Sequence, residues 1–548
     1  MENITKKTYG STAFPEGWVM IDTYRGLMEH RIKTKPDVAL FRCRDHFTDQ
    51  ERVVMPAEFK DQVDALSSWL ADKGYKRTHI AILGENSYQW VLTMFAVICS
   101  DNILVTLDKG LEYATMDSIF GRSDSTVLFY SAEYEDKAKK LEEHFGSQLY
   151  KLEEVDDFVS AGRGITGHEN ITTDPDAMAV LMYTSGTTGP AKGVMLSQRN
   201  IMGNLSMSVQ RPDLVGDTIY LLPLNHIYGL GPALLIHFLT GSTNTINLNL
   251  RFMKKDILEA KPEILIVVPI FVEMLYASLW KGIKAAGMEE KIQAVIAHNR
   301  KAGNVTPAAK REMFKEVLAG FGGRLSRIVS GGAPLNMKHF DGFMDFGIEV
   351  MNGYGITEGA PVLAVNPIAK NKPASTGLMV AGEEIKIDSP DENGDGEICV
   401  KGPNVMLGYY KDEEETAKTL KDGWLYTGDK GFLDEDNYVY VNGRIKNLII
   451  LNNGENVSPE ELEGMLCNCP AIFESVVYEK DEKICVQIFR NEEYITSNNI
   501  EDPDTMIRNF ISDMNRELAT YKRINVVQFR DEPFEHTTSK KIKRSSAS

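Results

Sequence analysis

Short apolar runs recur along the first 380 residues and alternate with stretches of helical periodicity. Each run is short enough to be a strand buried in a sheet. Residues 18–69 are predicted to be mainly helical, with a strand near 38–41. The alternation of strands and helices predicts α/β layers around mostly parallel sheets. The further predicted elements are a helix at 90–98 and strands at 80–83, 104–106, 126–130, 177–182, 218–222, 264–268 and 327–330.

The pattern changes after about residue 380 and again at Gly443. Short strands predicted at 384–387, 396–401 and 438–441, broken by Gly, Asn and Asp, indicate a small β-rich subdomain at about 380–442. A restart of the pattern from Gly443 predicts a further domain. That domain has a helix starting near Ser458 and Pro459, a good N-terminal signal, and a final helix at about 504–518. We therefore expect a large N-terminal region, 1–442, of layered α/β subdomains plus the β-rich subdomain. A small α+β lid domain, 443–548, follows it.

The composition restricts the partners more than the function. A chain of 548 residues is too long for one simple core and predicts roughly two to four domains. The net charge of −18 argues against non-specific nucleic-acid binding. The six cysteines are scattered without a zinc pattern, so we expect reduced thiols in a cytoplasmic protein.

No segment has the pattern of a membrane span. The N-terminus lacks the apolar core of a signal peptide. Residues 264–280 are the most apolar run, but Pro269 and Glu273 interrupt them, which favours a buried strand followed by a helix. Loose contact with a membrane through an exposed apolar patch stays open.

The strand-like run at 177–182 leads into a loop rich in glycine and hydroxyls, residues 183–194 (YTSGTTGPAKGV). Glycines let backbone N–H groups approach an anion, and Lys192 adds a positive charge. The loop is not a Walker loop, because Ala191 and Gly193 stand where that motif needs Gly and Ser or Thr. A polar surface loop is the alternative. The candidate phosphate-binding residues are Thr184, Ser185, Gly186, Thr187, Thr188, Gly189 and Lys192.

Two further segments have the chemistry of a nucleotide site. In residues 352–358 (NGYGITE), Tyr354 can stack on a purine, Thr357 can donate to a phosphate, and Glu358 can hold Mg²⁺. The small residues of 330–334 (SGGAP) allow a flat ligand to approach the backbone. Taken alone, each segment is equally typical of a tight turn.

These motifs, with those named below, follow one another along the chain from Tyr183 to Arg544 in the order typical of one family. They resemble the motifs of the AMP-forming adenylating enzymes, which include acyl-CoA synthetases, luciferases and peptide-synthetase adenylation domains. The resemblance implies that Asp429 and Arg444 bind the ribose of ATP and that Lys446 is the hinge of a rotating lid. Asn447 stands where the family commonly has an acid. The residues expected to frame the nucleotide are Gly332, Ala333, Pro334, Asn352, Gly353, Tyr354, Gly355 and Thr357.

The resemblance also places residues beside the reacting groups. Lys541, near the end of the chain, is expected to neutralise charge at the carboxylate and the α-phosphate, although Lys540 stands where the family usually has Gly. The gate segment 223–230 (PLNHIYGL) places His226 beside the acyl site, as a pocket residue that need not act as a base. The expected catalytic set is Lys541, Glu358, Thr184 and His226, with Glu358 on the metal, and the expected acyl pocket is His226, Tyr228, Leu230 and Gly331.

The implied reaction uses ATP, Mg²⁺ and coenzyme A. A carboxylate attacks the α-phosphate, pyrophosphate leaves, and a thiol then attacks the acyl-adenylate. Magnesium, the phosphate loop and Lys541 supply the electrostatic stabilisation, so no covalent enzyme nucleophile is required. In the family, the lid rotates between the two steps.

The acid itself is the least determined part of the reaction. The gate segment lacks the aspartate with which amino-acid-activating relatives bind the substrate's amino group. Ile227 stands where relatives that recognise aryl acids often have Asn. The lid motif at 453–462 and the chain end resemble bacterial long-chain acyl-CoA synthetases, which favours a medium- or long-chain fatty acid. Adenylation of an aryl or amino acid for a separate carrier protein stays open. A non-catalytic nucleotide-binding or scaffold protein is disfavoured, because Glu358, Asp429, Arg444 and Lys541 are all present.

Overall fold

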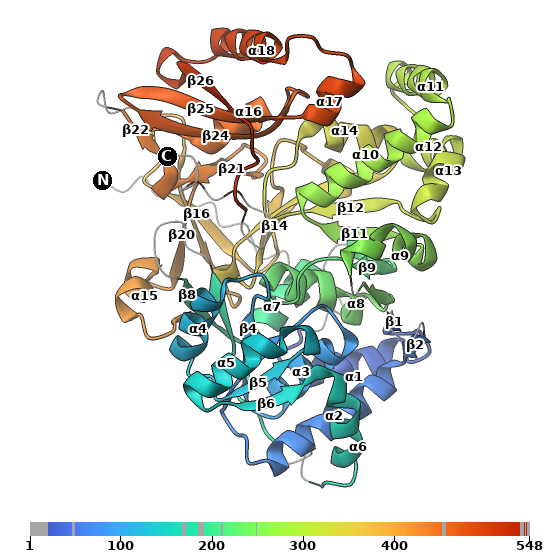
Figure 1. Ribbon diagram of the computed structural model, residues 1–548, viewed down its shortest axis with the longest axis vertical. Helices are drawn as coiled ribbons and strands as arrows, with labels where there is room; N and C mark the ends of the chain where they lie inside the picture. Colours follow the sequence, from blue (N-terminus) through green and yellow to red (C-terminus); the bar gives the residue numbers. More distant parts are fainter. Residues whose placement is uncertain are drawn as a thin grey trace.

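The computed structural model describes residues 20–45, 50–166, 171–184, 191–209, 212–247, 249–451, 456–536, 542 and 544 (Figure 1). The phosphate-loop residues 185–190, and with them Ser185, Gly186, Thr187, Thr188 and Gly189, lie outside this description, as does Lys541. Among the described residues, no helix is both long and apolar enough to cross a membrane.

One sheet has the strand order β18-β8-β7-β4-β3-β5-β6, and the phosphate loop connects its strands β7 and β8. Strands β7, β4, β3, β5 and β6 run parallel, and β8 turns back antiparallel to β7. The predicted strands at 80–83, 104–106, 126–130 and 177–182 are all present here. The bounds are β3 (His79–Leu83), β4 (Ile103–Leu107), β5 (Val127–Tyr130), β6 (Gln148–Lys151), β7 (Met178–Thr184), β8 (Lys192–Ser197) and β18 (Gly408–Tyr409).

Helices cover both faces of this sheet because its strands are apolar on both sides. Ile80 and Ile82 belong to the core on the side of α2 and α3, whereas Ala81 and Leu83 pack with α4 and α5. Helix α3 is apolar all round and starts at Ser87, whose side chain accepts from the Trp90 amide. The helices are α2 (Pro56–Asp72), α3 (Tyr88–Cys99), α4 (Tyr113–Arg122), α5 (Glu135–Phe145) and α6 (Val155–Gly162).

A second sheet has the strand order β11-β12-β13-β14-β15, of which β11, β12 and β13 are parallel. Its parallel strands end at the two candidate nucleotide segments, since Gly331 follows β12 and Ile356 follows β13. Ligands commonly bind at such carboxyl ends. The elements are β11 (Ile264–Val267), α10 (Pro269–Ala285), α11 (Glu289–Ala302), α12 (Pro307–Met313), α13 (Lys315–Leu318), β12 (Arg327–Ser330), α14 (Met337–Asp345), β13 (Glu349–Gly355), β14 (Val362–Val365) and β15 (Leu378–Met379).

The N-terminal region differs from its sequence prediction. The predicted strand near 38–41 lies at β1, which begins at Phe41, and a second strand, β2, pairs antiparallel with it. The hairpin was not predicted because charged residues such as Arg42, Arg44 and Glu51 alternate with the apolar residues of its strands and make the apolar pattern hard to recognise. The elements are α1 (Tyr24–Thr34), β1 (Phe41–Asp45), β2 (Gln50–Val54), α7 (Gln198–Ser208), β9 (Thr218–Tyr220), α8 (Leu234–Thr240), β10 (Asn244–Ile246) and α9 (Met253–Ala260).

The segment predicted to be β-rich forms an antiparallel sheet of β16, β17, β20, β19 and β21. The strands predicted at 384–387, 396–401 and 438–441 are all found, the last shifted toward Arg444. The sheet lies between the C-terminal elements at the top of Figure 1 and the first sheet below. Its elements are β16 (Glu384–Asp388), β17 (Gly396–Lys401), α15 (Glu413–Thr419), β19 (Leu420–Lys421), β20 (Trp424–Leu433) and β21 (Val439–Arg444).

The C-terminal elements have a hydrophobic core of their own, which includes Leu462, Val486 and Ile507. The predicted helix start is present, since the Ser458 side chain accepts from the Glu461 amide and Pro459 is the first residue of α16. The domain boundary at residue 443 stays a prediction. The elements are β22 (Ile449–Ile450), β23 (Asn456–Val457), α16 (Pro459–Leu466), β24 (Ile472–Lys480), β25 (Lys483–Arg490), α17 (Glu492–Ser497), α18 (Pro503–Glu517) and β26 (Val526–Arg530).

A buried polar contact joins α7 to the first residue of β14, Val362. The Asn204 amide donates to the Val362 carbonyl at 2.6 Å and accepts from its N–H at 3.1 Å. The same amide lies 3.4 Å from Oε1 of Glu383, whose side chain is 2 % exposed. Burial raises the pKa of Glu383 well above its usual range. Burial therefore favours the neutral carboxyl in the folded protein.

This buried acid makes stability depend on pH. Above about pH 4.5 the unfolded chain releases the Glu383 proton while the folded chain keeps it, so the free energy of unfolding falls as pH rises, by up to about 1.4 kcal/mol per pH unit, until the folded-state pKa is reached. As the pH rises above about 4.5, we expect the melting temperature of the wild type to drop more steeply than that of Glu383→Gln. Thermal melts at a series of increasing pH values measure it. The control is Glu384→Gln, at the partly exposed neighbouring position, and a wild-type profile parallel to that of Glu383→Gln would contradict the expectation.

Candidate active site

The described candidate residues converge on one cleft of about 2400 Å³. The walls come from the ends of β7, β12, β13, β20 and β21, and from α16 of the C-terminal part. Leu230 is the exception, because it is fully buried in the hydrophobic core. The candidate residues on the cleft are Thr184, Lys192, His226, Tyr228, Gly331, Gly332, Ala333, Pro334, Asn352, Gly353, Tyr354, Gly355, Thr357, Glu358, Asp429, Arg444 and Lys446.

The carboxylate of Asp429 receives two of the predicted nucleotide residues. The Tyr354 hydroxyl donates to Oδ2 at 2.6 Å, and Nε of Arg444 lies 2.7 Å from Oδ1. Asp429 and Arg444 are directly opposite on the antiparallel strands β20 and β21, and the Asp429 side chain is 5 % exposed. The contact thus joins β13 to the β-rich sheet at the floor of the cleft.

Electrostatics holds this group in defined protonation states. Burial and then the Asp429 charge raise the pKa of Tyr354 well above its usual range, so the phenol stays a hydrogen-bond donor. Burial alone lowers the pKa of Arg444, but Asp429 and other nearby groups outweigh it and raise that pKa. The guanidinium therefore stays charged beside the carboxylate.

The phosphate-loop lysine and the expected metal ligand lie on adjoining elements. Lys192 pairs with Thr184 across the β7–β8 hairpin and forms an ion pair with Glu415 of α15. Glu358 lies in the turn Thr357–Gly359 after β13, and the Tyr409 hydroxyl donates to its Oε1 at 2.9 Å. Tyr409 and Glu415 were not predicted from the sequence, because no motif marks them and their contacts join distant segments.

Glycines at two positions let backbone and ring approach closely. A Cβ at Gly331 would lie 3.0 Å from the Tyr228 ring, whose hydroxyl donates to the Val267 carbonyl at 3.3 Å. A Cβ at Gly355 would lie 2.0 Å from the Pro361 carbonyl oxygen. At neighbouring Asn352 the side-chain amide donates to the Pro373 carbonyl at 2.7 Å. These contacts shape the part of the cleft where the purine is expected.

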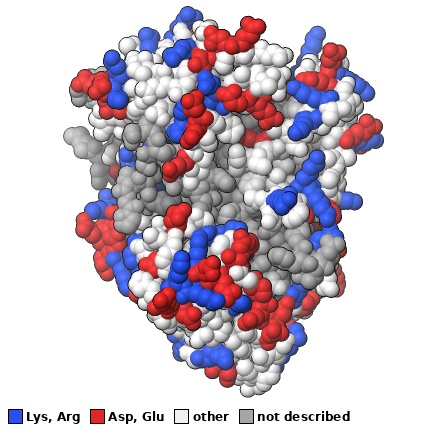
Figure 2. Space-filling model, viewed as in Figure 1, with Lys and Arg blue, Asp and Glu red and all other residues white. Residues whose placement is uncertain are grey.

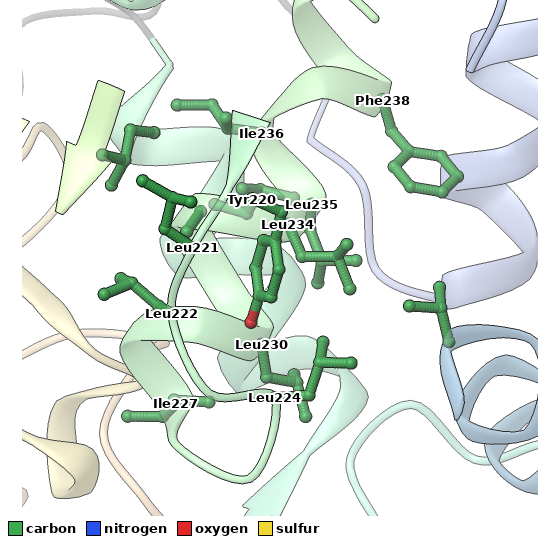
Figure 3. Close-up of a cluster of buried hydrophobic side chains, with 14 of the residues drawn as sticks. Tyr220, Leu221, Leu222, Leu224, Ile227, Leu230, Leu234, Leu235, Ile236 and Phe238 are labelled. Atoms are coloured by element: carbon green, nitrogen blue, oxygen red, sulfur yellow. The ribbon is translucent and has the colours of Figure 1, made fainter. Parts of the chain in front are cut away.

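The gate segment lies against the buried apolar cluster of Figure 3. His226 faces Asp108, with Nε2 and Oδ2 3.7 Å apart. Leu221 and Leu222 are on the cleft wall, whereas Leu230 and Leu234 belong to the core. The apolar surroundings of the gate are therefore partly lining and partly core. Other apolar residues on the wall include Leu214, Ile236, Leu250, Ile266, Val268, Ile270 and Phe271.

The C-terminal part closes the cleft from the other side. Nη2 of Arg544 lies 2.5 Å from Oε2 of Glu463 and 3.3 Å from Oε1 of Glu460, both on α16. The Asn447 amide donates to Oε1 of the same Glu460 at 2.6 Å. Burial raises the pKa of Glu463 to about 7, although Arg544 opposes the shift. Helix α16 therefore contacts both Asn447, next to the predicted hinge Lys446, and Arg544, near the end of the chain.

Lys446 lies within this charged environment. Burial, followed by the charges of Arg444 and Lys192, lowers its pKa, while Asp429 and Glu358 act in the opposite direction. The residue that the sequence assigned to the hinge is thus close to the nucleotide residues. On the face visible in Figure 2, acidic and basic side chains are interspersed.

Comparisons with known proteins agree with this architecture. A family model described as AMP-binding enzyme matches residues 29–410, and a second, described as AMP-binding enzyme C-terminal domain, matches 446–548. Long chain acyl-CoA synthetase 5 of Arabidopsis thaliana is 28 % identical over 77 % of this chain and 70 % of its own. 4-Coumarate–CoA ligase 3 of Oryza sativa subsp. japonica is 32 % identical over 65 % of this chain and 61 % of its own.

Among solved structures, o-succinylbenzoate coenzyme A synthetase of Bacillus subtilis, in complex with ATP and a magnesium ion, superposes with a TM-score of 0.72. It is 24 % identical and covers 95 % of this chain and 98 % of its own, a likeness that shows the shared fold. Because the first family model spans well over half of the sequence, the chain belongs to the family of AMP-binding enzymes, the adenylate-forming ligases.

Proposed function

We propose that this AMP-forming ligase activates a medium- or long-chain fatty acid with ATP and Mg²⁺ and transfers the acyl group to coenzyme A. The observation that carries the proposal is the meeting of Asp429, Tyr354 and Arg444 in the same cleft as Lys192 and Glu358. These residues come from separate stretches of the chain and have the donors and charges that ATP needs.

The nucleotide is bound along the wall that β13, β20 and β21 form. Asp429 accepts from the ribose hydroxyls, with Arg444 beside it, and the ring of Tyr354 flanks the adenine, together with the flexible backbone at 331–334. Thr184 and Lys192 lie at the two ends of the phosphate loop and direct a hydroxyl and an ammonium at the β- and γ-phosphates. The nucleotide is thus held at its base, its sugar and its phosphates.

Glu358 has the chemistry of a Mg²⁺ ligand. Mg²⁺ in nucleotide sites takes one or two carboxylates together with phosphate oxygens, and Glu358 reaches the cleft from the turn after β13. When bound, the ion neutralises phosphate charge. Thr357, the preceding residue, adds a hydroxyl donor at the same place.

The first step joins two anions, and the cations of the cleft reduce their repulsion. A carboxylate oxygen of the acid attacks the α-phosphorus, the bond to pyrophosphate breaks, and an acyl-adenylate forms. Lys192 stabilises the leaving pyrophosphate, and Lys541 stabilises the reacting carboxylate and α-phosphate. The thiol sulfur of coenzyme A then attacks the acyl carbon, and AMP leaves.

The two steps require different positions of the C-terminal part, which rotates about Lys446. The contacts of the hinge support this role, because Asn447 donates to Glu460 where relatives commonly have an acid at this position. The Asn447 amide donates this hydrogen bond, which an ionised acid at the same position could not do. Lys446 itself stays close to the charges of the nucleotide site.

The apolar wall of the cleft supports a fatty acid. Its leucine, isoleucine, valine and phenylalanine side chains favour a hydrocarbon chain over a charged substrate, and His226 and Tyr228 stand at its entrance. A relative that acts on long-chain acids, by its name, matches 77 % of this chain. The aryl acid of the coumarate ligase relative is the second candidate, because that relative is 32 % identical.

A panel of acids tests the substrate. We expect mass spectrometry, after incubation with ATP, Mg²⁺ and coenzyme A, to detect acyl-CoA from saturated acids of about eight carbons or more at rates at least tenfold above those of coumarate, benzoate and amino acids. A buried CH₂ group contributes about 0.8 kcal/mol, so rates should rise with chain length over several carbons. Preferential turnover of coumarate would establish the aryl alternative instead.

Substitution of Lys541 tests the role of this residue in adenylation. We expect Lys541→Ala to slow acid-dependent ATP–pyrophosphate exchange by about a hundredfold or more, because it removes a charge that acts on the transition state. ATP binding, measured by calorimetry, should change little. Lys540→Ala is the matched control, and a larger loss in Lys540→Ala than in Lys541→Ala would show that the neighbouring lysine has the role.

A further inference from the structure

One short segment is hydrogen-bonded to both the phosphate-loop hairpin and the turn that holds Glu358. Strand β18 pairs with β8, with Tyr409 opposite Val194, and the Tyr410 amide donates to the Gly193 carbonyl at 2.7 Å. Just before β18, the Met406 amide donates to the Glu358 carbonyl at 2.9 Å. The backbone of residues 406–410 therefore fixes the distance between the hairpin and the turn.

The Tyr409 side chain repeats this connection within the cleft. It is 6 % exposed, and its hydroxyl donates to Oε1 of Glu358 at 2.9 Å. Nζ of Lys192 lies 5.1 Å from the centre of the same ring, a cation–π distance. A single side chain thus touches the phosphate-loop cation with its face and the expected metal carboxylate with its hydroxyl.

The neighbouring charges agree with a bridging role. Lys192 forms its ion pair with Glu415, and Glu358 receives the Tyr409 hydroxyl, so the two groups have separate partners. The helix that carries Glu415, α15, is itself held next to Tyr409. Asp412 caps this helix, and the Tyr409 amide donates to the hydroxyl of Thr416, on the same helix, at 2.9 Å.

We propose that Tyr409 is a positioning residue of the adenylation site, holding the Lys192 ammonium against its ring and the Glu358 carboxylate at its hydroxyl. The inference rests on the proposed function, because it assumes that Lys192 faces phosphates and Glu358 faces the metal. Tyr409 orients both groups and does not itself contact the reacting atoms. It is a partner of the metal ligand, and loss of such partners typically weakens metal binding 10- to 100-fold.

Two substitutions separate the functions of the ring and the hydroxyl. Tyr409→Phe keeps the ring under Lys192 and removes the hydroxyl from Glu358. Tyr409→Leu removes both. The matched control is Tyr410→Phe, which deletes the hydroxyl of the adjacent tyrosine, a donor to Oδ2 of Asp124 at 2.6 Å. Thermal melts of all variants establish that they are folded.

The readout is binding to the full-length protein and needs neither acid nor thiol. Electron paramagnetic resonance measures the affinity for Mn²⁺ in the presence of α,β-methylene-ATP, and calorimetry measures the affinity for the analogue without metal. We expect Tyr409→Phe to weaken Mn²⁺ binding about tenfold and to leave metal-free binding of the analogue within about twofold. Tyr409→Leu should weaken both, and Tyr410→Phe neither.

Wild-type affinity for Mn²⁺ in a folded Tyr409→Phe would overturn the proposal. So would equal losses of metal-dependent and metal-free binding in Tyr409→Phe, since these would indicate a general disturbance of the cleft. If the expected split is found but no acid yields acyl-CoA, the inference about Tyr409 stands and the proposed function fails. If the analogue does not increase Mn²⁺ affinity in the wild type, both fail.

Discussion

The Asp429 carboxylate is the contact on which the arrangement of the cleft depends. It accepts the Tyr354 hydroxyl from the parallel sheet and faces Arg444 on the adjoining strand of the β-rich sheet. A nearly buried carboxylate with one partner removed is strongly destabilising, so both partners have to be in place. The Asp429 contact therefore joins the two sheets that form the nucleotide wall, in addition to the backbone bridge between Gly377 and Val439, and the segment from Arg444 to Asn447 starts beside it.

The same principle extends along the rest of the cleft. Lys192 is paired with Glu415, Glu358 with Tyr409, and Arg544 with Glu460 and Glu463, each contact joining residues distant in sequence. Charges that stand ready for a polyanionic substrate would repel or collapse onto one another without such partners. The partners keep these charged side chains apart and in place, so the side chains reorganise little when a ligand binds. Such preorganised charges are the basis of electrostatic catalysis.

Local pattern was enough to predict much of the fold. The strand predicted at 327–330 and the helix start at Ser458 match the structure because apolar runs and capping residues act over a few neighbours. The hairpin of β1 and β2 was not predicted, because its charged residues obscure the alternation of apolar and polar positions that is typical of a strand. Motif residues such as Asp429 were identified by resemblance, whereas Tyr409 and the buried Glu383 depend on contacts between distant segments, which no local pattern records. The roles of the site residues stay predictions, and Ser185–Gly189 and Lys541 also lie outside the described residues.

Helix α16 binds the hinge segment and the chain end at one place. Glu460 accepts from Asn447 and also lies beside Arg544, which Glu463 holds from the next turn. Asn447, Glu460, Glu463 and Arg544 all follow Lys446 in the chain, so a rotation about Lys446 would carry their contacts along unchanged. The hydrogen bond from the Ser458 hydroxyl to the Asn442 carbonyl spans Lys446, and it is the one of these contacts that such a rotation would have to break.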